Sequence, residues 1–147
     1  MVDSARVKTT LRLRIGLVAA LLALAACGGG GGGDEAPPLQ PTLASIQANV
    51  FTPICADSGC HASPGMLGLN LDNVTNSASS LINVPSFYGG GLVRLVPGDS
   101  DASFLIQKLG PNPMFGDRMP YMKPPLAQVT IDVIRQWIES CSGNTCP

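Results

Sequence analysis

The sequence predicts an all-α fold, with short helices and long irregular loops, for the folded part of the chain. Apolar residues recur at helical spacing near residues 42–52 and again over 131–138. Shorter helices are expected at 76–82 and at about 101–109, because proline and glycine interrupt the segments between them. A chain of 147 residues allows one small domain once its N-terminal segment is set aside.

The first and last helices are the clearest elements because each presents one continuous apolar face. Thr42 is expected to cap the first helix and Pro53 to end it. The apolar faces consist of Leu43, Ile46, Val50 and Phe51 in the first helix, and of Ile131, Ile134, Trp137 and Ile138 in the last. Each helix is therefore expected to turn its apolar face toward the core.

Residues 1–27 are expected to be an export segment and not part of the fold. Four basic residues precede an apolar run at 15–26, which is too short to span a bilayer comfortably as a helix. The run ends in Leu24-Ala25-Ala26-Cys27, which looks like a bacterial lipobox, in which Cys27 is lipidated and becomes the mature N-terminus. A plain signal peptide cut nearby is the alternative.

Residues 28–41 are expected to form a tether, and residues 42–147 the folded domain. Six glycines make the start of the tether flexible, and prolines stiffen its far end. A domain anchored by lipid needs such a spacer to stand clear of the membrane. We therefore expect an exported protein that is lipid-anchored in the bacterial cell envelope and faces the periplasm or the cell surface.

The mature chain is expected to be acidic. Without residues 1–27 it has five basic and nine acidic residues, which gives a net charge of −4 at neutral pH. This charge argues against nucleic acid or anionic lipid as the main partner. The chain has one histidine and no serine or cysteine nucleophile with a second base, so nothing indicates a hydrolase.

The segment Cys55-Ala-Asp-Ser-Gly-Cys60-His61 carries the chemistry on which the functional interpretation depends. The adjacent Cys60 and His61 are typical of a c-type haem attachment site, in which cysteines form thioethers and the histidine binds iron. Four residues separate the cysteines where the usual motif has two, and Gly59 suits the bulge that this interval requires. Two alternatives stay open: a disulfide between Cys55 and Cys60, or a metal site, although structural zinc would need four ligands.

The composition favours a prosthetic group. About a hundred folded residues contain seven aromatic side chains and long proline-rich loops, so their core is thin. Small domains of this kind usually need disulfides, a metal or a prosthetic group for stability. A buried haem would give the helices and loops a large apolar surface to pack against.

On these residues the chain resembles the cytochrome c family, and more closely the small c-type domains of exported bacterial proteins. The resemblance covers about residues 45–140, from Cys55, Cys60 and His61 through Arg118-Met119-Pro120 to the helix of Trp137. It implies one covalent haem c held by Cys55 and Cys60, with His61 and Met119 as axial ligands. It also implies that the C-terminal helix crosses the first helix and that Trp137 packs between them.

Methionines other than Met119 also lie near enough in sequence to be considered as ligands. Met122 is the main alternative, because it lies three residues from Met119 and could reach the same iron. Met114 is a weaker candidate, and Met66 lies too close to His61 to reach the opposite face of a haem. A methionine in such a loop is also often part of the core.

The expected function is electron transfer by a membrane-tethered mono-haem cytochrome that is not itself an enzyme. Its partners would be redox proteins, and no small-molecule substrate is expected, because both axial positions would be occupied. The alternative is a haem-free lipoprotein, stapled by disulfides, that acts as a binding or structural module.

Cys141 and Cys146 flank a turn-forming Gly143-Asn144 pair after the last helix. An exported protein would oxidise two cysteines placed so closely, so a disulfide is expected. Two free thiols or a second metal site are the alternatives.

Overall fold

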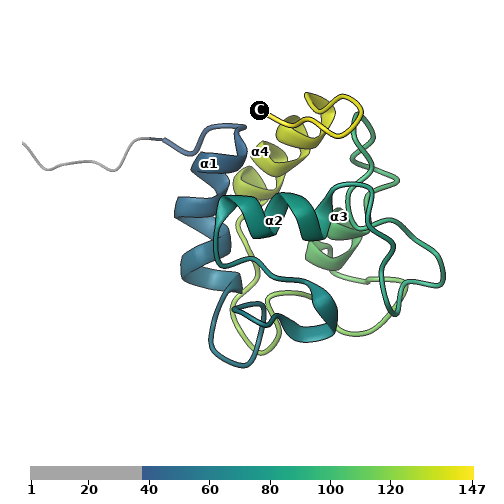
Figure 1. Cartoon of the computed structure of the whole chain (residues 1–147). Coiled ribbons are helices and arrows are strands. Elements are labelled where there is room, and N and C mark those ends of the chain that lie inside the picture. Colours follow the sequence, from purple (N-terminus) through teal and green to yellow (C-terminus); the bar gives the residue numbers. More distant parts are fainter. Residues whose placement is uncertain (1–37) are drawn as a thin grey trace, which may run out of the picture. The chain divides into compact units, whose positions relative to one another are not determined.

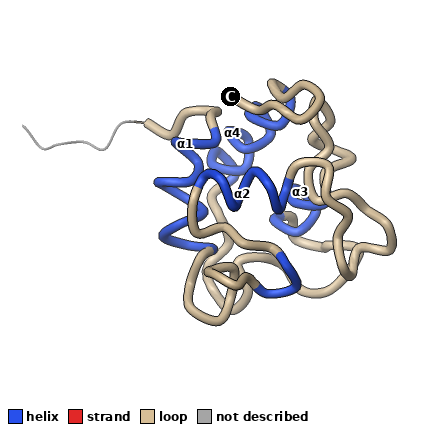
Figure 2. Tube along the Cα trace, in the orientation of Figure 1, coloured by secondary structure: helices blue, strands red, loops and turns tan. Residues whose placement is uncertain are grey.

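The structure is a computed structural model that describes residues 38–147 (Figures 1 and 2). Regular structure in this part is helical, without a strand among the described residues, which confirms an all-α domain. The helices are α1 (Leu43–Ile46), η1 (a π-helix, Gln47–Cys55), η2 (a 3₁₀-helix, Met66–Gly68), α2 (Val74–Leu81), α3 (Phe104–Leu109) and α4 (Gln128–Glu139). The predicted export segment with Cys27, and most of the predicted tether, lie outside the described residues.

No helix within residues 38–147 is long and apolar enough to cross a membrane.

The first helix begins where the sequence predicted but ends later. The Thr42 hydroxyl accepts a hydrogen bond from the Ser45 amide at 3.3 Å, so the predicted cap is confirmed. The predicted end at Pro53 is wrong, because η1 continues α1 to Cys55 with Pro53 inside it. The wider π turn, seen in the 2.7 Å bond from the Ala56 amide to the Phe51 carbonyl, does not use the α-helical bonds that proline disrupts. The helix thereby carries Cys55 at its last residue.

The first and last helices bury their apolar faces together, as predicted. The eight residues that the pattern selected are all buried: Leu43, Ile46, Val50, Phe51, Ile131, Ile134, Trp137 and Ile138. The rings of Phe51 and Trp137 meet edge to face, with centroids 6.3 Å apart, and so join the two helices. The C-terminus also returns to the start of α1, where the Leu43 amide donates to the Pro147 carbonyl at 2.7 Å (Figure 1).

Helices α2 and α3 begin at residues other than those predicted from the sequence. Helix α2 begins at Val74 because the Asn73 side chain accepts the Asn76 amide at 2.9 Å. Helix α3 begins at Phe104 and not near residue 101, because the Asp99 carboxylate accepts the Ala102 amide at 2.9 Å and holds a turn there. Helix α3 then packs against α4, and α2 packs against α1.

The C-terminal turn contains the predicted disulfide. Cys141 and Cys146 are bonded, with their Cα atoms 4.2 Å apart. Ser142 and Thr145 exchange backbone hydrogen bonds of 2.8 and 3.0 Å across the turn, and Gly143 has a φ of +59° that glycine adopts easily. A loop this short constrains little of the unfolded chain, so the bond is expected to stabilise the domain by no more than about 2–3 kcal/mol.

Glu139, the last residue of α4, ties that helix to the segment before α3. Its Oε1 accepts the Ser100 amide at 2.9 Å, and the hydrogen bonds from Ser100 hold the pKa of this carboxyl below its usual range. Because the folded-state pKa is the lower one, the stabilisation is present above the unfolded pKa of about 4.3 and is lost as the pH falls through the folded value.

We therefore expect Glu139→Gln to destabilise the domain at pH 7 and to destabilise it progressively less as the pH falls below the unfolded pKa of about 4.3. Urea unfolding of both proteins at several pH values measures the difference in the free energy of unfolding. A difference that stayed constant between these pH values would contradict the assignment.

Candidate functional site

A cavity of about 690 Å³ lies between the first helical segment, η2 and the loop that follows α3. Most of the side chains that line it are apolar, and exposed Phe87, Tyr88 and Tyr121 are among them, so it opens to the surface. Its volume is in the range of about 300–1,000 Å³ that is typical of cofactor and ligand sites. Cys55, Cys60, His61 and Met119 all line this cavity, whereas Met122 and Met114 do not.

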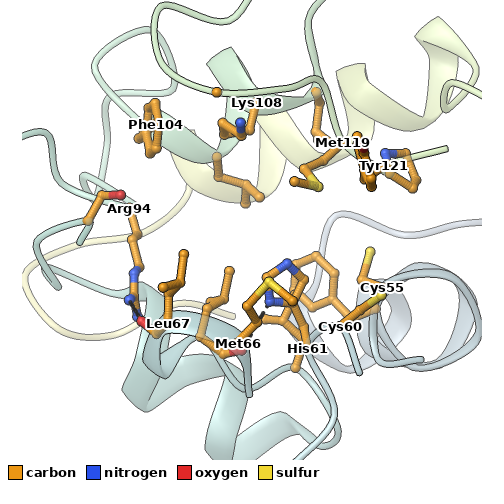
Figure 3. Close-up of a pocket in the computed structure, with 18 of the residues that line it drawn as sticks. Cys55, Cys60, His61, Met66, Leu67, Arg94, Phe104, Lys108, Met119 and Tyr121 are labelled. Carbon is orange, nitrogen blue, oxygen red and sulfur yellow. Dashed lines mark hydrogen bonds between the residues drawn. The ribbon is translucent and has the colours of Figure 1, made fainter. Parts of the chain in front are cut away.

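The loop between Cys55 and His61 closes on itself. The His61 amide donates to the Cys55 carbonyl at 3.2 Å, and the Cys60 amide donates to the Asp57 carbonyl at 2.9 Å. Gly59 has a φ of +85°, a conformation that other residues rarely adopt, so it permits the bulge that the long interval was expected to need. Both cysteines and His61 thus belong to one wall of the cavity (Figure 3).

A contact with a backbone carbonyl orients the His61 ring. Its Nδ1 lies 3.2 Å from the Leu69 carbonyl oxygen, and because a carbonyl can only accept, Nδ1 carries the hydrogen. Burial lowers the pKa of His61, although the Leu69 carbonyl acts in the opposite direction. A neutral ring bonded in this way has its free lone pair on Nε2, as a metal-binding histidine requires.

The two thiols beside His61 are not bonded to each other. Cys55 is half-buried and Cys60 is exposed, and both are free. Burial raises the pKa of the Cys55 thiol to about 11, with Lys123 acting in the opposite direction. Among the described residues, no three His, Cys, Asp or Glu side chains are grouped as they would be to hold a metal ion.

Met119 lies on the opposite wall. Figure 3 shows its side chain across the cavity from the His61 ring, and both are directed into the space between the walls. Met119 is half-buried and packs against the core, whereas the Met122 side chain is 88% exposed. Met66 also lines the cavity, but from the wall of His61.

Lys123 connects the two walls. Its ammonium donates to the Ile54 carbonyl at 3.0 Å and forms an ion pair with Asp57, inside the loop between the cysteines. The hydrogen bond to Asp57 raises the pKa of Lys123. The segment after Met119 is therefore fastened to the loop that carries Cys55 and Cys60.

Neither the family models, nor the curated proteins, nor the solved structures that were compared match this chain. The arrangement of side chains in the cavity is therefore the guide to function. The His61 imidazole and the Met119 thioether lie on facing walls, with two free thiols beside the imidazole.

Two cations of the site were missed by sequence reasoning. Arg94 is 8% exposed, and its guanidinium donates to the carbonyls of Leu67, Gly68 and Ser80 at 2.8–2.9 Å. Lys108, at the end of α3, also lines the cavity. A charged residue inside the apolar run at 92–96 was the available indication for Arg94, since arginine is rarely buried without partners. No comparable pattern marked Lys108.

Proposed function

We propose that this domain binds one haem c and transfers electrons, as a cytochrome c-like carrier. Cys55 and Cys60 would form the thioethers, and His61 and Met119 would be the axial ligands. The observation that carries the proposal is the placement of the His61 ring and the Met119 side chain on facing walls of an apolar cavity, with two free thiols beside His61.

The residues present fit such a group. The Leu69 carbonyl directs His61 so that Nε2 is free, and the closed loop keeps Cys60 beside it. Phe51, Leu71 and Leu81 give the cavity an apolar lining that excludes water from whatever it holds. Arg94 also lines the cavity, and its positive charge would offset the negative charge of haem carboxylates.

Electron transfer follows from this ligand set. A bound haem supplies a one-electron couple between ferric and ferrous iron. His61 and Met119 would fill both axial positions, so no position is left for a substrate. The soft sulfur of Met119 and the apolar lining both favour the ferrous state, so a comparatively high reduction potential is expected.

We propose that Cys27 carries lipid and that residues 28–41 tether the domain to a membrane of the cell envelope. The exposed Phe87, Tyr88 and Tyr121 at the cavity would leave one edge of the haem accessible to redox partner proteins.

The decisive experiment is to produce the full chain with a cytochrome c maturation system. We expect a coloured protein with a reduced-minus-oxidised spectrum of a c-type haem, which retains its haem through acid–acetone extraction. The variant with both Cys55→Ser and Cys60→Ser is the matched control and should release any haem in the extraction. A colourless wild-type protein, with Cys55 and Cys60 joined in a disulfide, would instead support the haem-free lipoprotein.

The single variants Cys55→Ser and Cys60→Ser test how much each cysteine contributes to haem attachment across the unusual four-residue interval. Cys60→Ser is expected to reduce covalent attachment more than Cys55→Ser, because Cys60 is the neighbour of His61. Intact mass spectrometry after extraction measures the fraction of each variant that carries haem.

A further inference from the structure

One residue of α3, Lys108, makes three hydrogen bonds to the segment from Phe115 to Met119. The Lys108 ammonium donates to the Phe115 carbonyl at 3.0 Å and also to the Asp117 carbonyl. The Lys108 carbonyl in turn accepts the Met119 amide at 2.7 Å. Side chain and backbone of one residue therefore hold three points of the loop that ends at Met119.

The shape of the loop is adapted to this ammonium. Gly116 has a φ of +64°, and a Cβ atom added there would lie 3.3 Å from the Lys108 Nζ atom. Glycine therefore lets the backbone curl closely around the charge. The Phe115 ring meets the Phe104 ring edge to face with centroids 6.4 Å apart, and the Lys108 ammonium lies 5.9 Å from the Phe104 centroid.

Lys108 acts on the loop through backbone carbonyls. The ion pairs among the described residues are formed by Lys123 and Arg135 and do not include Lys108. Lys108 is half-buried as a residue, and hydrogen bonds from a charged donor such as its ammonium are stronger than those between neutral groups. Arg118 adds a neighbouring contact, from its Nε to the Leu109 carbonyl at 3.0 Å. The last two residues of α3, Lys108 and Leu109, thus hold this loop in place through hydrogen bonds.

We propose that Lys108 is a positioning residue that fixes how far and in which direction the Met119 side chain enters the cavity. The inference rests on the proposed function, because Met119 would be the ligand whose sulfur is held in place. Without the ammonium, the carbonyls of Phe115 and Asp117 lose their common donor and the loop gains freedom to move. The sulfur then spends more of its time away from the position opposite His61.

The test compares Lys108→Met, which keeps an unbranched side chain but removes the donor, with Arg135→Met as a control that removes a cation elsewhere. In haem-loaded protein, Lys108→Met should reduce the ferric band of iron-bound sulfur by at least about threefold, while the Soret band and the helix content stay as in the wild type. Arg135→Met should keep the band, and Lys108→Arg should restore part of it. A Lys108→Met protein with the wild-type band would overturn the proposal.

A second measurement does not depend on haem. In haem-free protein, amide hydrogen exchange at Met119 should become about tenfold faster in Lys108→Met, whereas exchange at Ile134 in α4 should not change. Gly116→Ala, which strains the loop around the same ammonium, should also speed exchange at Met119 if Lys108→Met does not fold. Unchanged exchange at Met119 in these variants would refute the role of Lys108 whether or not the protein binds haem. Failure of the wild type to load haem would refute only the proposed function.

Discussion

Replacement of Met119 by alanine is expected to abolish the ferric absorption band of iron-bound sulfur in haem-loaded protein. The side chain that faces His61 across the cavity would be missing, so one axial position would open. Because sulfur favours ferrous iron, the reduction potential should fall by more than about 60 mV, which corresponds to a tenfold loss of that preference. Redox titration followed by visible spectroscopy measures both effects.

Met122→Ala is the matched control for this experiment. Its side chain is 88% exposed and does not line the cavity, so its removal should leave both the band and the potential as they are in the wild type. The opposite result, in which Met122→Ala loses the band and Met119→Ala keeps it, would move the ligand assignment by three residues.

Replacement of Trp137 by alanine is expected to have the largest effect on stability. The Trp137 side chain is fully buried, and its ring meets Phe51 edge to face at the contact between the first and last helices. Removing a buried aromatic side chain costs about 3–5 kcal/mol. A small domain has about 5–15 kcal/mol of stability in total, so much of the variant should unfold at low concentrations of urea.

The variant Trp137→Phe distinguishes the contribution of the aromatic ring contact to stability from that of the indole N–H. The Nε1 atom of Trp137 is buried and has no hydrogen-bond partner among the described residues, so phenylalanine loses area but no hydrogen bond. We expect a smaller loss than for alanine in the free energy of unfolding, measured by urea titration of each protein. Equal losses in the two variants, or a loss below about 1 kcal/mol in Trp137→Ala, would contradict this role.

The features predicted correctly from the sequence depend on residues that are close along the chain. The apolar spacing in 43–51 and 131–138 identified two buried helix faces, and the Thr42 cap needed only the residue three positions on. The disulfide of Cys141 and Cys146 likewise needed only a turn of four residues. Periodicity and turn chemistry act over a few residues, so they can be read without knowledge of the fold.

The errors arose where a local rule was overridden. Pro53 was expected to stop the first helix, but a change to the π-helical bonding pattern lets the helix pass through it. The start of α3 was placed near residue 101, but the Asp99 carboxylate stabilises a turn there in place of a first helical turn. In both cases two local conformations were compatible with the residues, and the choice between them was not visible in the pattern.

By itself, the sequence determined which groups of the candidate site are close together along the chain. Cys60 and His61 are adjacent residues, and Gly59 permits the bulge that brings Cys55 back to them. Only the tertiary structure decided that Met119 and not Met122 faces His61, and that Arg94 and Lys108 border the same cavity. The physical reason is the range of the interactions. Adjacency is fixed by covalent bonds, whereas the position of a side chain across a cavity depends on how helices far apart in the sequence pack together.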